Sequence, residues 1–324
     1  MPPVNRNEPI RAESSESTYS LMEFMREFPD DATCLEWLWR NRYSHNGTEA
    51  QCPKCEEVRT FKRYTTAQRR QSWTCTACGE HLHPTAGTIY HKSSTSLHLW
   101  FYATYLMTST RCGISAKQLE RELGVTYKTA WRMAHLIRHE LMTQEGDEPL
   151  SGEVEMDETY VGGRPRYRSG LRPVRDAYGR KKMGRRPLTH PNQKVAVLGA
   201  VERGGRIRAT VAPASLTNVN ALVERIMPAS TIFTDEARLY DKLKAKGYTH
   251  HRINHSKKVY VSGNIHTNTI EGFWSLTKNG IRGVYHAVSA KHLQGYLNQY
   301  AWRYNHRSDA RAQFETLLLR SARR

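Results

Sequence analysis

The stretch that decides the fold is TIFTD at 231–235 together with NTIEGFWSLTK at 268–278. The first run has the length and composition of a buried strand and ends on Asp235, whereas the second has the apolar spacing of a helix. Glu271 stands in that helix with 35 residues between it and Asp235, and Lys278 follows seven positions later. Because seven residues make close to two helical turns, we expect Glu271 and Lys278 on one helix face.

A third carboxylate comes earlier, in SGEVEMDETYVGG at 151–163. Apolar and acidic residues alternate there, which indicates a strand, and Asp157 lies in its middle. Asp157 is singled out because it has the two downstream partners already described. The other acids of the stretch are interpreted as solvated charges: Glu153, Glu155 and Glu158.

Strand and helix patterns alternate around these carboxylates, in the order strand, hairpin, helix, strand, helix, strand, helix. This order fits a mixed sheet with helices on both faces, in which the first strand lies in the centre beside the fourth. Asp157 would then stand next to Asp235, at the end of the sheet where α/β proteins tend to place their sites. The predicted segments after the first strand are a hairpin at 194–214, helices at 216–227, 236–247, 268–280 and 289–307, and strands at 231–235 and 251–260.

The residue types predict metal-dependent phosphoryl transfer. Mg²⁺ and Mn²⁺ prefer carboxylate ligands, and two such ions can activate an attacking oxygen and stabilise the leaving one. Asp157, Asp235 and Glu271 are the predicted ligands, and Lys278 is predicted to contact a DNA phosphate. Water would attack first and cut a phosphodiester, and the freed 3′ hydroxyl would then join another DNA. Asn268 and Glu271 also have capping-box spacing, so Glu271 either turns to the metal ions or serves Asn268 as a cap, and Asn268 itself is a possible helper at the metals.

The charge of the chain points to a polyanionic partner. The 49 Lys and Arg residues outnumber the 31 Asp and Glu residues and leave a net charge of +18, which suits double-stranded DNA. Residues 164–186 hold ten Lys and Arg and one Asp, and with their Gly, Pro and Tyr content they predict a flexible basic arm on DNA phosphates, although a solvated loop remains the alternative. The arm residues predicted to bind DNA are Arg180, Lys181, Lys182, Arg185 and Arg186.

Two cysteine pairs predict a zinc ribbon. CPKC at 52–55 and CTAC at 75–78 are separated by 19 residues, and each pair can form a tight knuckle that points two thiolates at one ion. Four thiolates close the coordination shell, so a single structural Zn²⁺ is expected. The predicted ligands are Cys52, Cys55, Cys75 and Cys78.

A helix-turn-helix pattern follows in ISAKQLERELGVTYKTAWRMAHLIRHEL at 114–141. Ser115 can cap the first helix, Gly124 can end it, and Thr126 can cap the second. Basic side chains on the second helix could reach DNA, although an ordinary helical hairpin remains the alternative. These side chains are Lys128, Arg132 and Arg138. The apolar run just before, at 97–108, fits either a helix or a strand.

Domain boundaries follow from these patterns. We expect a disordered N-terminus with short helices at 1–48, the zinc ribbon at 49–92, the helix-turn-helix-like DNA-binding domain at 93–146, the catalytic domain at 147–310 and a tail at 311–324. No apolar run approaches the roughly 18 residues that span a bilayer, and the N-terminus has no apolar signal core. The expected location is therefore the cytoplasm, in association with the nucleoid.

Several motifs in order resemble a known family. MDETYVGG at 156–163, FTDEARLY at 233–240 and the long run from HTNTIEGFWSLTK to RYNHR at 266–307, behind the CPKC and CTAC pairs and GTIYHKSSTSLHLWFYA at 87–103, resemble the DDE transposases of bacterial insertion sequences. More narrowly they resemble the zinc-ribbon-bearing branch related to Merlin elements, over about residues 20–310. The resemblance implies an α/β, ribonuclease H-like mixed-sheet catalytic domain behind a zinc ribbon and a helix-turn-helix-like domain. It also implies a divalent metal, recognition of terminal inverted repeats, and the triad Asp157, Asp235 and Glu271 with Lys278 beside it.

Two alternatives to a transposase remain at this point. One is a nuclease on the same fold, which would cut without joining. The other is a DNA-binding regulator, built from the zinc ribbon and the helix-turn-helix, whose sheet domain is inactive. The presence of all three carboxylates favours the transposase, and because two DNA ends must be brought together, a homodimer or larger assembly on DNA is expected.

Overall fold

The computed structural model describes residues 19–65, 71–110, 112–144, 148–162, 172–175, 179–184, 194–253 and 265–323. The chain divides into two compact units: the first comprises Met1–Thr143 and His306–Arg324, and the second comprises Gln144–Asn305. None of the described helices is both long enough and apolar enough to cross a bilayer.

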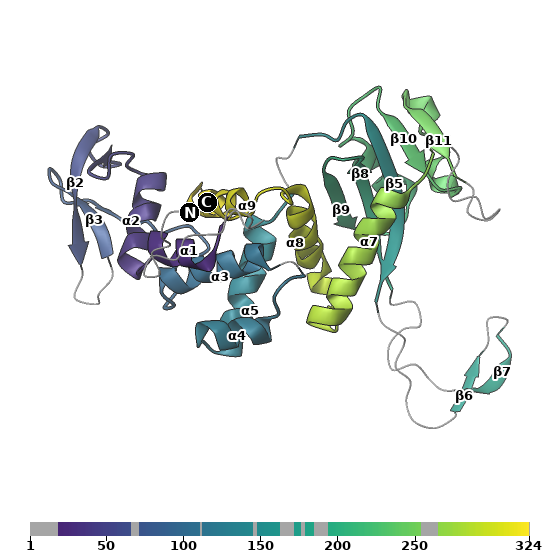
Figure 1. The fold of residues 1–324 in the computed structure, drawn as a ribbon, viewed down its shortest axis with the longest axis horizontal. Helices are drawn as coiled ribbons and strands as arrows, with labels where there is room; N and C mark the ends of the chain where they lie inside the picture. The colour runs from purple at the N-terminus through teal and green to yellow at the C-terminus, as the bar shows by residue number, and fades with distance from the viewer. Residues whose placement is uncertain are drawn as a thin grey trace, which may run out of the picture. The chain divides into compact units, whose positions relative to one another are not determined.

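The second unit is built on a five-stranded mixed sheet in the order β11-β10-β5-β8-β9 (Figure 1). β10 pairs in parallel with β5 and β11, whereas β8 is antiparallel to both β5 and β9. The first strand therefore lies in the centre beside the fourth, as predicted, and the order is that of a ribonuclease H-like sheet. The strands are β5 (Glu153–Val161), β8 (Val195–Glu202), β9 (Ile207–Val211), β10 (Thr231–Thr234) and β11 (Thr249–Arg252).

Helices cover both faces of this sheet. α7 (Asn268–Gly280) and α8 (Leu293–Asn305) pack against one face, where Ile270, Phe273 and Trp274 join Val197 and Val201 in one buried cluster. α6 (Leu216–Val223) packs against the other face, in a second cluster with the apolar residues of β5. Side chains of a strand alternate between faces, so the acids at odd positions of β5 point toward α7.

Two predicted elements of this unit differ from the structure. The helix expected at 236–247 is instead two 3-10 turns, η2 (Arg238–Tyr240) and η3 (Lys244–Lys246), because burial of Tyr240 and Leu243 in the α6-side cluster ties this short stretch to the sheet. The strand expected at 251–260 is β11, which begins two residues earlier and ends at Arg252. Residues 254–264 lie outside the described part of the chain.

The first unit contains the predicted ribbon, an antiparallel sheet in the order β1-β2-β3-β4. Trp73 of the ribbon stacks on Trp39 with ring centroids 4.7 Å apart and thereby joins the ribbon to α2. The elements are β1 (Glu49–Gln51), β2 (Val58–Thr65), β3 (Gln71–Cys75), β4 (His81–Leu82), α1 (Leu21–Glu27), α2 (Asp31–Arg42) and α3 (Leu97–Ser109), so the ambiguous apolar run is a helix.

The helix-turn-helix is formed by α4 (Ala116–Leu123) and α5 (Tyr127–Leu136) with the predicted caps. Ser115 accepts a bond from the amide of Gln118, and Gly124 takes the left-handed conformation at φ 62° that ends α4. The prediction that Arg138 could reach DNA is wrong. Its side chain is buried in the short π-helix Ile137–Leu141, where it donates to the carbonyl of Ile114.

The residues expected to form a tail, 311–324, lie largely in a helix. α9 (Ala310–Arg323) belongs to the first unit, where the ring of Phe314 is buried against aromatic side chains of the N-terminal helices. Farther along α9, Ser321 accepts a hydrogen bond from the hydroxyl of Tyr90 at 2.9 Å. The rings that contact Phe314 are those of Tyr19, Phe24, Phe28 and Tyr105.

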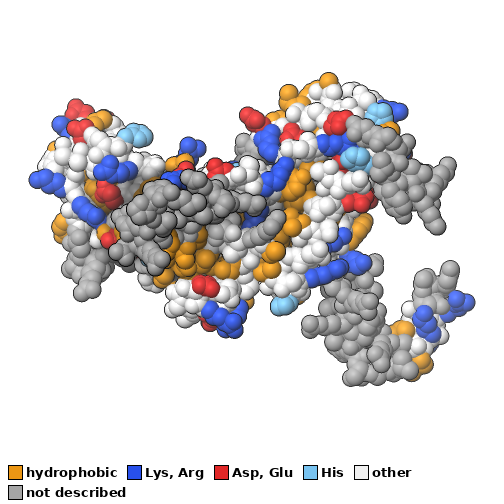
Figure 2. Space-filling model, viewed as in Figure 1, with side chains coloured by type: hydrophobic (Ala, Val, Ile, Leu, Met, Phe, Trp, Pro, Cys, Tyr) orange, Lys and Arg blue, Asp and Glu red, His pale blue; other side chains and the backbone are white. Residues whose placement is uncertain are grey.

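Part of the predicted basic arm forms a hairpin. β6 (Arg172–Arg175) pairs antiparallel with β7 (Lys181–Gly184). Lys and Arg side chains gather on this hairpin (Figure 2), where Arg180, Lys181 and Lys182 are exposed. Arg185 and Arg186 lie outside the described residues.

Candidate active site and zinc ribbon

Two of the predicted ligands belong to neighbouring parallel strands: Asp157 lies in β5, and Asp235 directly follows the end of β10. In the register of β10 with β5, Thr231 faces Glu153 and Phe233 faces Glu155. Continued by two residues, this register would bring Asp235 level with Asp157, and the charge of Asp235 does act on the Asp157 carboxyl. The orientation of the Asp235 carboxylate is fixed by a local hydrogen bond, in which Oδ1 accepts from the backbone amide of Ala237 at 2.9 Å.

The electrostatics of Asp157 are those of a crowded acidic site. Burial, reinforced by the negative charges of Glu158 and Asp235, raises the pKa of Asp157 to about 7, although hydrogen bonds from the amide of Glu158 and the indole of Trp274 act in the opposite direction. Two carboxylates forced together with little water favour proton uptake or a cation. The pair thus fits a divalent metal, which would remove the repulsion between the two carboxylates.

Lys278 also belongs to this site. Burial lowers its pKa, and the charge of Asp157 acts against that lowering, so the ammonium lies within electrostatic reach of the carboxylate. Between Glu271 and Lys278 on α7, Trp274 donates from its indole nitrogen to Oδ2 of Asp157 at 3.0 Å. Trp274 and Lys278 therefore both interact with Asp157 from α7.

Glu271 lies in the first turn of α7 with an exposed side chain. Its Oε1 accepts the hydroxyl of Thr267 at 3.0 Å. In the part of the chain that the structure describes, Asp157, Asp235 and Glu271 are not among the groups whose potential ligand atoms all lie within 4.8 Å of one another. Asp157 therefore has Asp235 and Lys278 as electrostatic neighbours, whereas the Glu271 carboxylate is hydrogen-bonded to the hydroxyl of Thr267.

The capping alternative for Glu271 is resolved by a residue that the sequence interpretation missed. Asn268 is the first residue of α7, not its cap, and no side chain of Thr267 caps the helix. The amides of Thr269 and Ile270 instead donate to Oε2 of Glu155, at 2.8 and 3.0 Å. The prediction that Glu155 is a solvated charge is therefore wrong; its place on the same strand face as Asp157 was the available signal.

Glu158 is also bound rather than solvated. It points to the opposite face of β5, where its Oε2 accepts the hydroxyl of Tyr240 at 2.7 Å. Tyr240 is buried, and desolvation raises its pKa. This contact ties the turn after Asp235 to the strand that carries Asp157.

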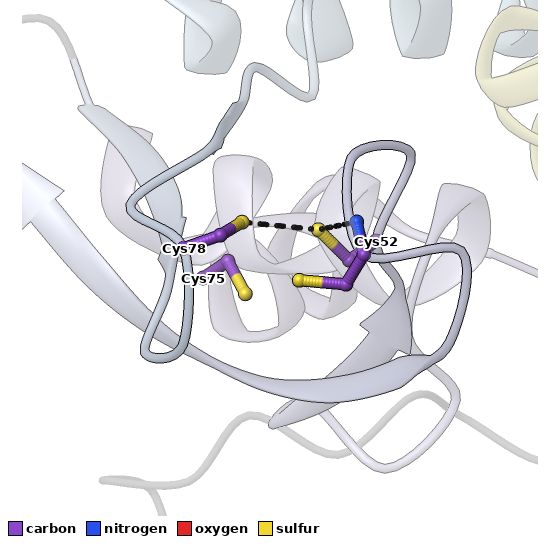
Figure 3. A group of neighbouring side chains, drawn as sticks. Cys52, Cys75 and Cys78 are labelled. Carbon is purple, nitrogen blue, oxygen red and sulfur yellow. Dashed lines mark hydrogen bonds between the residues drawn. The ribbon is translucent and has the colours of Figure 1, made fainter.

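The four cysteines of the ribbon form a compact sulfur cluster. Their Sγ atoms all lie within 4.8 Å of one another, and those of Cys52 and Cys78 are 3.5 Å apart. Figure 3 shows Cys52, Cys75 and Cys78 pointing toward one another from the two knuckles. A hydrogen bond from the amide of Cys78 lowers the pKa of Cys75 to about 7, whereas a hydrogen bond with the Cys78 thiol raises the pKa of Cys55 to about 12. Four soft sulfur donors in this arrangement fit Zn²⁺ and leave no position for a substrate.

Two of the three basic side chains that the sequence predicted to reach DNA from the first unit are exposed. Lys128 and Arg132 are both exposed on α5. They lie one turn apart on the helix, so both can reach along one face.

Comparison with known proteins gives concordant matches. The sequence model of the ISXO2-like transposase domain matches residues 149–305. An uncharacterized protein in transposable element ISH50 of Halobacterium salinarum is 30% identical over 257 residues, which cover 78% of this chain and 84% of the relative. An uncharacterized transposase-like protein of Haemophilus influenzae is 30% identical over 103 residues, 32% of this chain and 81% of the relative. Among solved structures, the Mos1 transposase paired-end complex with left transposon end aligns at a TM-score of 0.26 and 11% identity, over 68% of this chain and 78% of that one.

Proposed function

The chain belongs to the ISXO2-like transposases of insertion sequences, and from this we propose that it binds the terminal inverted repeats of its element, cuts the DNA there with divalent metal ions and joins the freed end to a target. Both the cutting and the joining are phosphoryl transfers, so one site can serve both.

The observation that carries this proposal is the electrostatic proximity of Asp157 and Asp235, which come from neighbouring parallel strands. When bound, two Mg²⁺ or Mn²⁺ ions would activate the attacking oxygen and stabilise the leaving one. Asp157 and Asp235 would hold the ions, Trp274 orients the first of these carboxylates, and Lys278 would bind a phosphate of the DNA beside them. The raised pKa of Asp157 supports this assignment, because perturbed carboxylates cluster at functional sites.

Glu271 completes the metal site after a side-chain rearrangement. Its carboxylate is exposed and bound to Thr267 through a hydroxyl, so a rotation within the first turn of α7 can bring it toward Asp157. A divalent cation held by Asp157 and Asp235 would attract it there, since the cation supplies the positive charge that the metal-free site lacks.

Basic residues of both units bind DNA. Lys128 and Arg132 contact DNA from α5 of the first unit. In the second unit the β6–β7 hairpin with Arg180, Lys181 and Lys182 neutralises phosphates, together with Arg185 and Arg186. A structural Zn²⁺ held by the four cysteines stabilises the ribbon. The chain works as a homodimer or a larger assembly, because two element ends have to be joined to one target.

The test uses the purified full chain with duplexes that carry the inverted repeats flanking its gene. We expect cutting and joining in Mn²⁺ or Mg²⁺ and none in chelator. Asp157→Asn, Asp235→Asn and Glu271→Gln should abolish both reactions while duplex binding survives. Asp241→Asn, which changes an exposed carboxylate of the same unit, is the matched control and should retain activity.

Other outcomes separate the alternatives. Cutting without joining would favour a nuclease. Binding without either reaction would favour a regulator. Full strand transfer by any one of the three carboxylate variants would overturn the assignment of that residue.

A further inference from the structure

Glu155 is a buried acid at the junction of three elements. Its side chain is 0% exposed, and it lies two residues before Asp157 on the same face of β5. Five groups lie within hydrogen-bonding distance of its carboxylate, and four of them are hydrogen-bonded to it. They are the amides of Thr269 and Ile270, the hydroxyl of Thr269, Nε of Arg203 and Nδ1 of His266.

The contacts with α7 occupy the positive end of that helix. The first amides of a helix have no partner within it, and the helix dipole favours a negative charge at this end. The backbone of α7 receives no cap from Thr267. Glu155 supplies the acceptor from another element, so α7 is fastened at its first turn to β5.

Arg203 extends the junction to the third element. Its Nε donates to Glu155 at 2.8 Å and its Nη2 donates to the carbonyl of His266 at 2.9 Å. Its guanidinium also lies 4.0 Å from the ring centroid of Phe233, two residues before Asp235 on β10. The pair of Glu155 and Arg203 therefore touches each of the three elements that carry the proposed metal ligands.

Two anchors of α7 on β5 determine the position of the Glu271 backbone. Glu271 directly follows Ile270, whose amide is held by Glu155, and Trp274 one turn later is held by Asp157. Two carboxylates at alternate positions of one strand thus fix α7 at two successive points. A shift of the first turn of α7 would move Glu271 relative to Asp157, and metal ligands must be held close to their productive geometry for the metal to bind.

We propose that Glu155 is a positioning residue for the metal site: through Arg203 and the first turn of α7 it holds Glu271 and Lys278 in register with Asp157 and Asp235. This inference rests on the proposed function for its activity readout. It has a second readout, the protection of the α7 amides, that does not depend on activity.

The test compares Glu155→Gln with Glu153→Gln in the full-length chain. Both variants change a carboxylate of β5 that pairs with Arg203, but Glu153 is exposed and its ion pair with Arg203 is at the surface. For Glu155→Gln we expect joining to fall by about 10- to 100-fold and the half-saturating Mn²⁺ concentration to rise, with duplex affinity unchanged. Hydrogen exchange at 269–271 should become faster, and Glu153→Gln should match the wild type in every readout.

Each outcome decides the inference. Equal Mn²⁺ dependence and equal exchange in the two variants would overturn it. If Glu155→Gln fails to fold, Thr269→Val takes its place, because it removes a hydroxyl that donates to Glu155 at 3.0 Å and keeps the backbone amide; unchanged Mn²⁺ dependence and exchange in this variant would overturn the inference. If the wild type neither cuts nor joins, the proposed function fails, while faster exchange at 269–271 still establishes the junction as the anchor of α7.

Discussion

The indole N–H of Trp274 donates a hydrogen bond of 3.0 Å to Oδ2 of Asp157. Trp274 stands on α7 between Glu271 and Lys278, so the helix that carries two proposed catalytic side chains also orients the first proposed metal ligand. An N–H donor favours the ionised form of a carboxylate, and the bond therefore opposes the effect of burial on the pKa of Asp157.

Replacing this donor should weaken the metal site. In Trp274→Phe the ring remains apolar but the N–H is lost, so we expect joining to fall by about 10- to 100-fold and the half-saturating metal concentration to rise. Trp302→Phe, at a buried tryptophan of α8, controls for lost ring volume. Titration of Mn²⁺ in a strand-transfer assay measures the effect; identical Mn²⁺ curves for the two variants would show that the indole bond has no such role.

The raised pKa of Asp157 has a consequence for stability. Its carboxyl has an ordinary pKa of 3.8 and one of about 7 in the fold, so the folded state binds more protons between these values and the metal-free protein gains stability as pH falls from 8 toward 4. Asp157→Asn should be more stable than wild type at pH 8 by up to about 4 kcal/mol. Chemical unfolding in chelator should show this difference shrinking steadily below pH 7; a difference independent of pH would contradict it.

Gly199 gives Trp274 the room to reach Asp157. Gly199 pairs with Asp157 in the register of β5 with β8, and a Cβ there would lie 2.6 Å from the Trp274 ring. We expect Gly199→Ala to cost about 1–3 kcal/mol of unfolding free energy and to reduce joining. Gly272→Ala on the exposed side of α7 meets nothing within 4 Å and should be neutral or stabilising by up to about 1 kcal/mol. Similar losses in both variants would mean that the ring tolerates a Cβ.

Zinc should be bound by the ribbon in a ratio of about one ion per chain, since a four-thiolate site is closed. Cys52→Ser removes one ligand and should release the metal and unfold the ribbon. Cys112→Ser, at an exposed cysteine outside the cluster, should keep it. Metal analysis of both purified variants provides the measurement, and a wild type without zinc would refute the assignment.

The basic face of α5 should contribute to DNA affinity through counterion release. Replacing both Lys128 and Arg132 by Ala is expected to weaken duplex binding and to reduce the slope of log K against log salt by roughly 2. Lys117→Ala on α4, where the ammonium pairs with Glu120 at 2.5 Å, should leave the slope unchanged. Binding isotherms across a salt series separate these cases, and an unaltered slope in the double variant would place the DNA elsewhere.

The parts of the fold that the sequence predicted are those with local signals. Alternation identified β5, the apolar run ending at Asp235 identified β10, and the order of elements placed them side by side. The two cysteine knuckles and the caps of α4 and α5 are likewise short-range patterns.

The parts that the sequence did not predict depend on distant partners. An acid in a strand looks the same whether it meets water or, as Glu155 does, an arginine 48 positions away and the amides of a helix more than 110 positions away. The packing of α9 also depends on distant partners, since the aromatic residues that contact Phe314 belong to the first third of the chain.

The position of α9 at residues 310–323 also affects the order in which the two units can fold during synthesis. Residues 144–305 leave the ribosome before the helix that completes the core around Tyr19 and Phe24. Domains generally fold as units during synthesis. The second unit, which carries the carboxylates, can therefore fold completely before α9 is synthesised. The first unit, which carries the ribbon and the helix-turn-helix, can complete its core only afterwards. A chain broken off after residue 305 would keep every proposed metal ligand and lose the buried face that Phe314, Leu317 and Leu318 supply.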